Sequence, residues 1–238
     1  MMSEVNSFIN ANAALASAMR VPWALIMDTC VMTRNGLSSV LKKTQFKAGE
    51  VMILNKASDI LLCLKSGLPD VVVMELCGDG ESVWEGLRII STCQQGWPQL
   101  PIVVCTALSD VRFLQQVKSL QVSSICFKHD PLESIEDCIM HARCGLHLDS
   151  PTIQKLLNSK CHSLQMLTKK EIEVLAYLLA GRSVSEVSRM LNRDIRTISN
   201  HKCHALTKLG YKNNNDLYTR GLWMLRNGLY NLEDAKQV

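Results

Sequence analysis

Five short apolar segments recur along the first half of the chain. They lie at residues 23–27, 51–54, 71–74, 102–105 and 124–127. Each has the length of a strand, and several are rich in β-branched residues. Between them, apolar residues repeat at helical spacing, as in Leu37, Val40 and Leu41. Strands buried on both faces that alternate with helices predict an α/β doubly wound domain with a parallel sheet, at about residues 22–145.

The pattern changes behind this domain. Apolar periodicity fades between residues 146 and 163, which predicts a linker. The apolar spacing of residues 164–228 is helical throughout, so we expect a second, all-α domain of four helices there. Residues 1–21 are expected to form an N-terminal extension, and residues 229–238 a tail.

The second domain has the sequence plan of a helix-turn-helix. Thr168 and Glu171 have the spacing of a capping box, which starts the first helix. Asn192 and Arg193 form a tight turn between the second and third helices, and Gly210 ends the third. In proteins of this plan the third helix enters the major groove of DNA.

A helical wheel of residues 194–209 separates an apolar stripe from a polar face. The stripe consists of Ile198, Ala205, Leu206 and Leu209. The opposite face is free of acidic residues and suits base edges and phosphates. We expect DNA contacts from this face, from the residues that flank it and from neighbouring basic residues. These are Arg189, Arg193, Arg196, Thr197, Ser199, Asn200, His201, Lys202, Cys203 and Thr207. Arg182, Lys208 and Lys212 are expected to add positive charge as phosphate clamps.

Composition and charge agree with this division. The 238 residues are 47% hydrophobic and 20% charged, which excludes wholesale disorder. Residues 1–159 hold 13 Lys and Arg against 15 Asp and Glu, whereas residues 160–238 hold 13 against 7. The basic rear favours a polyanionic partner, although charge alone fits a solvated basic face equally well. No apolar run suits a membrane span or an export signal, so we expect a cytoplasmic protein without a membrane partner.

The run from Leu167 to Gly210 resembles the LuxR/FixJ-type helix-turn-helix family. The matching positions are Thr168, Glu171, Glu173, Val174, Leu175, Gly181, Thr197, Ile198, His201, Lys208, Leu209 and Gly210. Ser199 stands where members often carry a basic residue, which leaves the identity of the base contacts open. The resemblance implies binding to double-stranded DNA and a dimer contact on the fourth helix. Leu217, Leu222 and Leu225 would form that contact, although packing within the chain is an equally good interpretation.

The first domain resembles a phosphoacceptor receiver, a flavodoxin-like fold. Receivers carry two acids after the first strand, an Asp after the third, a hydroxyl after the fourth and a Lys after the fifth. Asp28, Thr29, Glu75, Thr106 and Lys128 stand at these positions. Thr29 replaces an acid and Glu75 the phosphorylated Asp, so the resemblance predicts a degenerate, unphosphorylated receiver. Glu75 is expected to pair with Lys128, unless these are ordinary loop residues at strand ends.

Residues 24–40 and 192–202 carry most of a further resemblance, in which the chain is similar to the response regulator of the Rcs phosphorelay and to BglJ-type auxiliary regulators. That similarity implies a bacterial transcriptional regulator that acts as a homodimer, or as a heterodimer with a response regulator, with RNA polymerase as a further partner. Two alternatives remain. The front domain can instead sense a small signalling molecule, or the chain can be an enzyme, for which it has no nucleophile motif or cofactor fingerprint. Cys138, His141 and Cys144 are spaced poorly for a metal site, so we expect no metal and no cofactor.

Overall fold

A five-stranded parallel sheet forms the centre of the first domain. The computed structural model describes residues 22–43, 51–159, 165–215, 217 and 218. The strands are β1 (Ala24–Met27), β2 (Val51–Leu54), β3 (Val71–Met74), β4 (Ile102–Thr106) and β5 (Ser124–Phe127). Their order in the sheet is β2-β1-β3-β4-β5, and each neighbouring pair is parallel. The doubly wound α/β fold predicted from the apolar segments is therefore confirmed.

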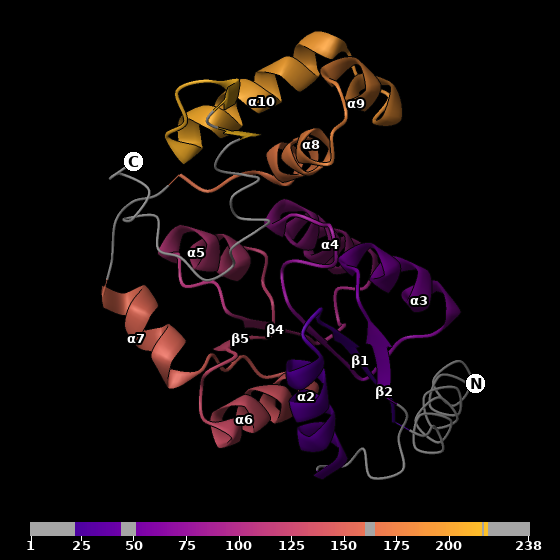
Figure 1. The fold of residues 1–238 in the computed structure, drawn as a ribbon, viewed down its shortest axis with the longest axis vertical. Helices are drawn as coiled ribbons and strands as arrows, with labels where there is room; N and C mark the ends of the chain where they lie inside the picture. The colour runs from indigo at the N-terminus through magenta and orange to yellow at the C-terminus, as the bar shows by residue number, and fades with distance from the viewer. Residues whose placement is uncertain (1–21, 44–50, 160–164, 216, 219–238) are drawn as a thin grey trace, which may run out of the picture.

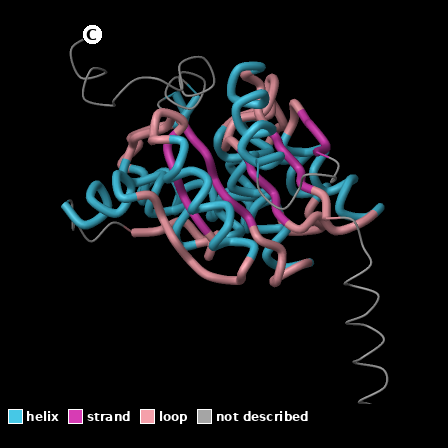
Figure 2. The backbone as a smooth tube through the Cα atoms, turned by 90° about the horizontal axis from the view of Figure 1, so that it is seen from below, coloured by secondary structure: helices cyan, strands magenta, loops and turns pink. Residues whose placement is uncertain are grey.

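Helices cover both faces of the sheet (Figures 1 and 2). They are α2 (Val31–Lys43), the short 3-10 turn η1 (Ala57–Asp59) with α3 (Ile60–Ser66), α4 (Val83–Gly96), α5 (Val111–Ser119) and α6 (Leu132–Arg143). Alternate strand residues point to opposite faces, as the two-residue period of a strand requires. Leu25 and Met27 belong to a core shared with α3, α4 and α5, whereas Ala24 and Ile26 pack with α2 and α6.

Gly86 is required where α4 passes over the end of β3. A Cβ atom at this position would lie 2.0 Å from the carbonyl oxygen of Leu76, well inside van der Waals contact. Any larger residue would push α4 away from the sheet. Because Leu76 directly follows Glu75, this close approach also fixes the loop that carries a candidate site residue.

The segment expected as a linker contains a helix, α7 (Pro151–Ser159). Ahead of it, the Ser150 amide donates to the Ile125 carbonyl, and the Ile125 amide donates to the Asp149 carboxylate. These bonds satisfy backbone groups at the outer edge of β5, and Ile153 of α7 is fully buried. Residues 146–159 therefore belong structurally to the α/β domain. The helical spacing of Ile153, Leu156 and Leu157, which indicates this covering helix, was missed.

The second domain contains three described helices and lies against the α4 side of the first (Figure 1). They are α8 (Lys169–Leu179), α9 (Val184–Met190) and α10 (Ile195–Leu209). Residues 214, 215, 217 and 218 begin the expected fourth helix, whereas the extension 1–21 and the tail 229–238 lie outside the described residues. Within the described part of the chain, helices fall short of the length and apolarity that a membrane crossing requires.

Candidate functional site

Two capping boxes define how the second domain begins its helices. The hydroxyl of Thr168 accepts a hydrogen bond from the Glu171 amide, and the Glu171 carboxylate accepts one from the Thr168 amide. Ser183 and Glu186 repeat the arrangement at α9. The first box was expected from the sequence. The second was missed, although the Ser-x-x-Glu spacing is visible in the sequence.

A strained turn sets the angle between α9 and α10. Asn192 adopts a positive φ of 48°, a conformation that Asn tolerates better than most residues. The hydroxyl of Ser188 donates to the Arg193 carbonyl at 2.6 Å, which ties the turn back to α9. The carboxylate of Asp194 caps α10 by accepting from the Arg196 amide, and Gly210 ends the helix at φ +70°.

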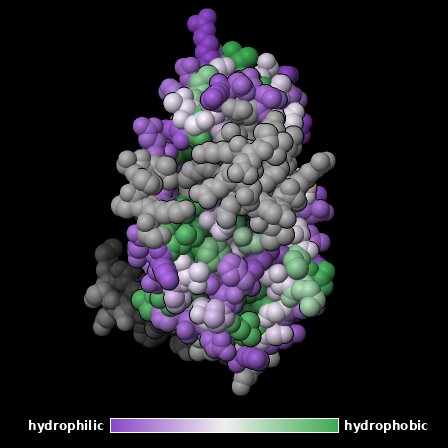
Figure 3. Space-filling model, turned by 60° about the vertical axis from the view of Figure 1, so that its left-hand side comes forward, coloured by the Kyte–Doolittle hydropathy of each residue, from purple (hydrophilic) through white to green (hydrophobic). Residues whose placement is uncertain are grey.

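The polar face of α10 is open to solvent. Arg196, Asn200, Cys203 and Thr207 are exposed along it, while Ile198 and Leu206 are buried on the other side. The other expected contacts flank this face: Arg189, Arg193 and Thr197 are exposed, and Ser199, His201 and Lys202 are partly buried. Figure 3 shows mainly hydrophilic side chains at the top of the molecule, where this domain lies. The structure thus places the ten side chains on and around one accessible helix.

Lys208, expected as a phosphate clamp, is paired with an acid of α8 in the structure. Its ammonium group lies 2.7 Å from the buried carboxylate of Glu171, and it lines a small cavity between the two domains. Burial raises the pKa of Glu171, but hydrogen bonds from Lys208 and Thr168 outweigh this and hold the pKa below its ordinary value. The structure therefore pairs a charge that was expected to be free, in an ion pair whose acidic side is buried.

The expected dimer contact is only partly described. Leu217 is fully buried and belongs to the hydrophobic core that joins the two domains. Leu222 and Leu225 lie outside the described residues. In the structure, Leu217 packs against residues of its own chain.

At the carboxyl ends of the strands, the structure brings four of the five receiver-like positions together. The Glu75 carboxylate accepts hydrogen bonds from the Leu76 amide at 2.7 Å and from the Thr106 hydroxyl at 2.6 Å. Its other oxygen accepts from the Ala107 amide and lies 3.1 Å from the Lys128 ammonium. Two amides, a hydroxyl and an ammonium group thus converge on one carboxylate, a donor set that suits an oxyanion.

Lys128 bridges the two acids of the cluster. Its ammonium nitrogen lies 2.7 Å from one oxygen of the buried Asp28 carboxylate, and the other Asp28 oxygen accepts from the Cys30 amide. Burial lowers the pKa of Lys128, but the charges of Glu75 and Asp28 outweigh burial and raise the pKa above its ordinary value. Lys128 therefore stays charged at neutral pH, where a cation is needed between two carboxylates.

Thr29, the fifth position, is exposed at the rim of this cluster. It lines an open hollow of about 490 Å³ together with Cys30, Glu75 and Lys128. The cluster is therefore open to solvent on this side. The backbone amides of Leu76 and Ala107 were missed by sequence reasoning, which identifies side chains and not amides brought together by folding.

The comparisons with known proteins assign the second domain. Residues 165–220 match the family described as bacterial regulatory proteins, luxR family. This stretch is a LuxR-family helix-turn-helix domain. The resemblance seen in the sequence is confirmed, and the LuxR-family domain contains every expected DNA contact, from Arg189 to Thr207.

Curated relatives include two bacterial regulators. The transcriptional regulatory protein RcsB of Escherichia coli strain K12 is 27% identical over 146 residues, covering 60% of this chain and 68% of RcsB. The oxygen regulatory protein NreC of Staphylococcus epidermidis is 23% identical over 210 residues, covering 81% of this chain and 93% of NreC. The similarity to NreC extends over both domains, and the one to RcsB over more than the LuxR-family domain alone.

Solved structures support the fold of both domains. RcsB from Salmonella enterica serovar Typhimurium, bound to promoter rprA with the phosphomimetic BeF3-, matches with a TM-score of 0.61 at 23% identity, covering 84% of this chain and 98% of that one. The isolated receiver domain of the same protein matches with a TM-score of 0.50 at 18% identity, covering 57% and 98%. The first domain therefore has a receiver-like fold.

Proposed function

We propose that the chain is a bacterial DNA-binding transcriptional regulator that acts without phosphorylation. The observation that carries this proposal concerns the Glu75 carboxylate. It accepts hydrogen bonds from the donors that a receiver uses to hold a transferred phosphoryl group. The proposal is supported by the open polar face of α10 in a LuxR-family domain. The chain acts by binding DNA and not as an enzyme.

DNA binding is assigned to α10 and its surroundings. Arg196 and Asn200 reach base edges in the major groove, because they occupy the centre of the exposed face in the first half of the helix. Arg189 and Arg193 lie beside the turn and contact phosphates, which fixes the register without reading sequence. Thr197, Ser199, His201, Lys202, Cys203 and Thr207 complete the contact surface.

Phosphorylation independence follows from the chemistry of the cluster. Glu75 is one methylene longer than the Asp of a receiver, and its oxygens already hold the donors that would stabilise an incoming phosphoryl group. The Lys128 ammonium group lies next to the Asp28 carboxylate. A receiver would hold Mg²⁺ at this carboxylate, with the help of a second acid at the position where this chain has Thr29. The longer Glu75 side chain thus places its carboxylate on Thr106, Ala107 and Lys128, where a transferred phosphoryl group would be held in a receiver. The receiver-like fold favours this interpretation over a domain that senses a small signalling molecule.

The test is incubation of the full chain with acetyl phosphate and Mg²⁺, with a phosphorylatable receiver as positive control. We expect no acid-labile phosphate on this chain and the same DNA affinity with and without the donor. A stoichiometric phosphate, or a DNA affinity that rises when the donor is added, would contradict the proposal.

The assembly that binds DNA is a homodimer or a heterodimer with a response regulator. Solved RcsB structures include two dimers bound to two DNA molecules, which supports a dimer here. Sedimentation of the full chain with duplex DNA, alone and with a purified response regulator, distinguishes the two assemblies. A single chain on each duplex under both conditions would contradict either form of dimer. Contact with RNA polymerase is a further proposal, tested by whether the polymerase changes the affinity of the chain for promoter DNA.

A further inference from the structure

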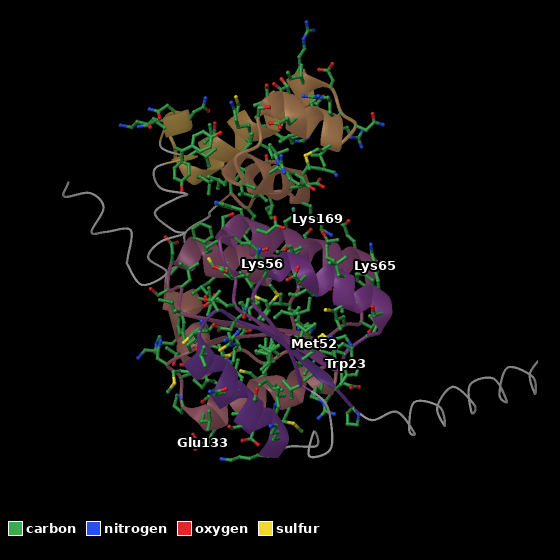
Figure 4. The ribbon with its side chains drawn as sticks, turned by 45° about the vertical axis from the view of Figure 1, so that its right-hand side comes forward. Trp23, Met52, Lys56, Lys65, Glu133 and Lys169 are labelled. Carbon is green, nitrogen blue, oxygen red and sulfur yellow. The ribbon has the colours of Figure 1, made fainter. Side chains whose placement is uncertain are left out.

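The LuxR-family domain packs on α4 and α5 through a continuous apolar contact. One hydrophobic cluster contains Trp84 and Phe113 of the receiver-like domain together with Ile172 and Leu175 of α8. Figure 1 shows α8 between α4 on one side and α9 and α10 on the other, and Figure 4 places Lys169, the first residue of α8, at this boundary. The two domains therefore share a core instead of meeting only through a connecting chain.

Gln116 gives this contact its specificity. Its side-chain nitrogen donates to the Leu167 carbonyl at 3.1 Å, and its side-chain oxygen accepts from the Leu167 amide at 2.7 Å. Gln116 is buried, with 5% of its surface exposed. A buried amide that satisfies both backbone groups of one residue tolerates little displacement, since moving it would leave several polar groups unpaired.

The bonds made by Gln116 continue to the recognition helix. Leu167 immediately precedes Thr168, the residue that caps α8 and forms the capping box with Glu171. The same Glu171 oxygen that accepts from Thr168 also accepts from Lys208 of α10. Gln116, the α8 cap and α10 are thus joined by one series of buried or partly buried hydrogen bonds.

Two further contacts lie at the boundary between the two domains. The guanidinium of Arg88 on α4 lies 5.4 Å from the centre of the Tyr177 ring on α8 and is also bound by Glu85. The rings of Trp84 and Phe113 lie 5.0 Å apart in a tilted arrangement beneath the domain boundary. The contact between Arg88 and Tyr177 crosses the domain boundary and favours one orientation of the LuxR-family domain, whereas the Trp84–Phe113 pair supports the docking surface from within the receiver-like domain.

This orientation leaves the DNA-binding face free. Arg196, Asn200 and Cys203 are exposed, and α10 lies on the side of α8 away from α4 (Figure 1). We propose that the LuxR-family domain binds DNA while docked on α4 and α5, with Gln116 as the residue that positions it. The proposal rests on the DNA binding proposed above and adds that the domains do not separate to achieve it.

The first test compares amide hydrogen exchange in full-length variants. Gln116→Leu keeps the volume but removes both hydrogen bonds, so exchange at residues 167–172 should rise about tenfold or more. Gln115→Leu is the matched control, because the side-chain oxygen of Gln115 has no hydrogen-bond partner among the described residues. Unchanged exchange in Gln116→Leu, with fold and melting temperature retained, would overturn the positioning role.

The second test adds a mixed-sequence DNA duplex about three helical turns long at saturating concentration. We expect residues 167–172 of the unaltered chain to remain as protected on DNA as without it. Faster exchange on DNA would overturn the proposal, because it would show that the domain leaves the receiver-like domain to bind. Absence of any binding would refute the proposed function instead, while the comparison of variants without DNA would still test the docking.

A third variant separates positioning from general destabilisation. Gln116→Glu keeps the acceptor for the Leu167 amide but faces the Leu167 carbonyl with a carboxylate. Protonation restores a donor, so protection at residues 167–172, measured against the unaltered chain at each pH, should recover as the pH falls toward about 4. Protection that stays equally low at every pH would contradict the hydrogen-bonding role of Gln116.

Discussion

Replacing Glu75 by Gln tests the internal charge cluster most sharply. Each carboxylate oxygen of Glu75 faces two donors: Leu76 and Thr106 on one side, Ala107 and Lys128 on the other. A Gln amide has one acceptor oxygen and one NH2 group, so in either orientation the NH2 group faces a backbone amide, that of Leu76 or that of Ala107. The variant keeps the volume of the side chain and removes only its charge and half of its acceptor capacity.

The size of the effect can be worked out from the hydrogen bond and the ion pair that the Gln side chain cannot make. If the NH2 group faces Ala107, an amide is left unpaired, which costs about 1–3 kcal/mol. The missing attraction to Lys128 adds about 1 kcal/mol, a modest figure because Lys128 is partly exposed and keeps its bond to Asp28. We therefore expect Glu75→Gln to reduce the free energy of unfolding by about 3 kcal/mol, a fall of roughly 6–12 °C in Tm for a chain of this size.

Differential scanning calorimetry of the full chain at neutral pH measures this change. Glu173→Gln is the matched control, because Glu173 is partly buried like Glu75 but makes only a helical pair with the exposed Lys170, which should contribute less than about 0.5 kcal/mol. If Glu75→Gln melts within the range of Glu173→Gln, the cluster does not hold Glu75 as described.

Three further predictions concern the LuxR-family domain. Arg196→Ala and Asn200→Ala should each cost about 1–3 kcal/mol in binding to a duplex selected from a random library, and normal affinity in both would show that another surface reads the bases. Arg193→Ala should reduce the slope of log Kd against log salt by about one, whereas Lys208→Ala should leave it unchanged; equal slopes would contradict their different roles. Glu171 has a lowered pKa, so its contribution to stability is present above its unfolded pKa and lost as the pH falls through its folded pKa. Urea unfolding from neutral pH to about pH 3 should therefore show a shallower acid loss in Glu171→Gln than in the unaltered chain, and equal losses would argue against the buried pair.

The sequence predicted those parts of the fold that depend on local pattern. The apolar segments became the five strands within a residue. Four of these strands are buried on both faces, which needs continuous apolar runs, whereas β2 lies at the edge of the sheet and exposes Met52 and Ile53. The wheel of α10 placed Ile198 and Leu206 inside and Arg196 outside, because a helix has a fixed period. The exposed polar face of α10 follows from the helical period alone.

Contacts between distant segments cannot be predicted from local sequence patterns. Gln116 and Leu167 are separated by 51 positions, and nothing in either local sequence indicates their bonds. Lys208 looked like a free charge because its partner, Glu171, lies 37 positions earlier on another helix. Helix α7 was missed although Ile153, Leu156 and Leu157 repeat at helical spacing, because the helix has only nine residues and the bond that ties it to the edge of β5 joins residues 24 positions apart.

The proposed function depends above all on a cationic helix face that binds duplex DNA in the unphosphorylated chain. The decisive experiment is the affinity of the full chain for duplex DNA over a range of salt concentrations, without a phosphate donor, alone and with a purified response regulator. We predict that log Kd rises linearly with log salt, with a slope of about 0.9 for each phosphate contacted. Absence of salt-dependent binding under both conditions would contradict the proposed function.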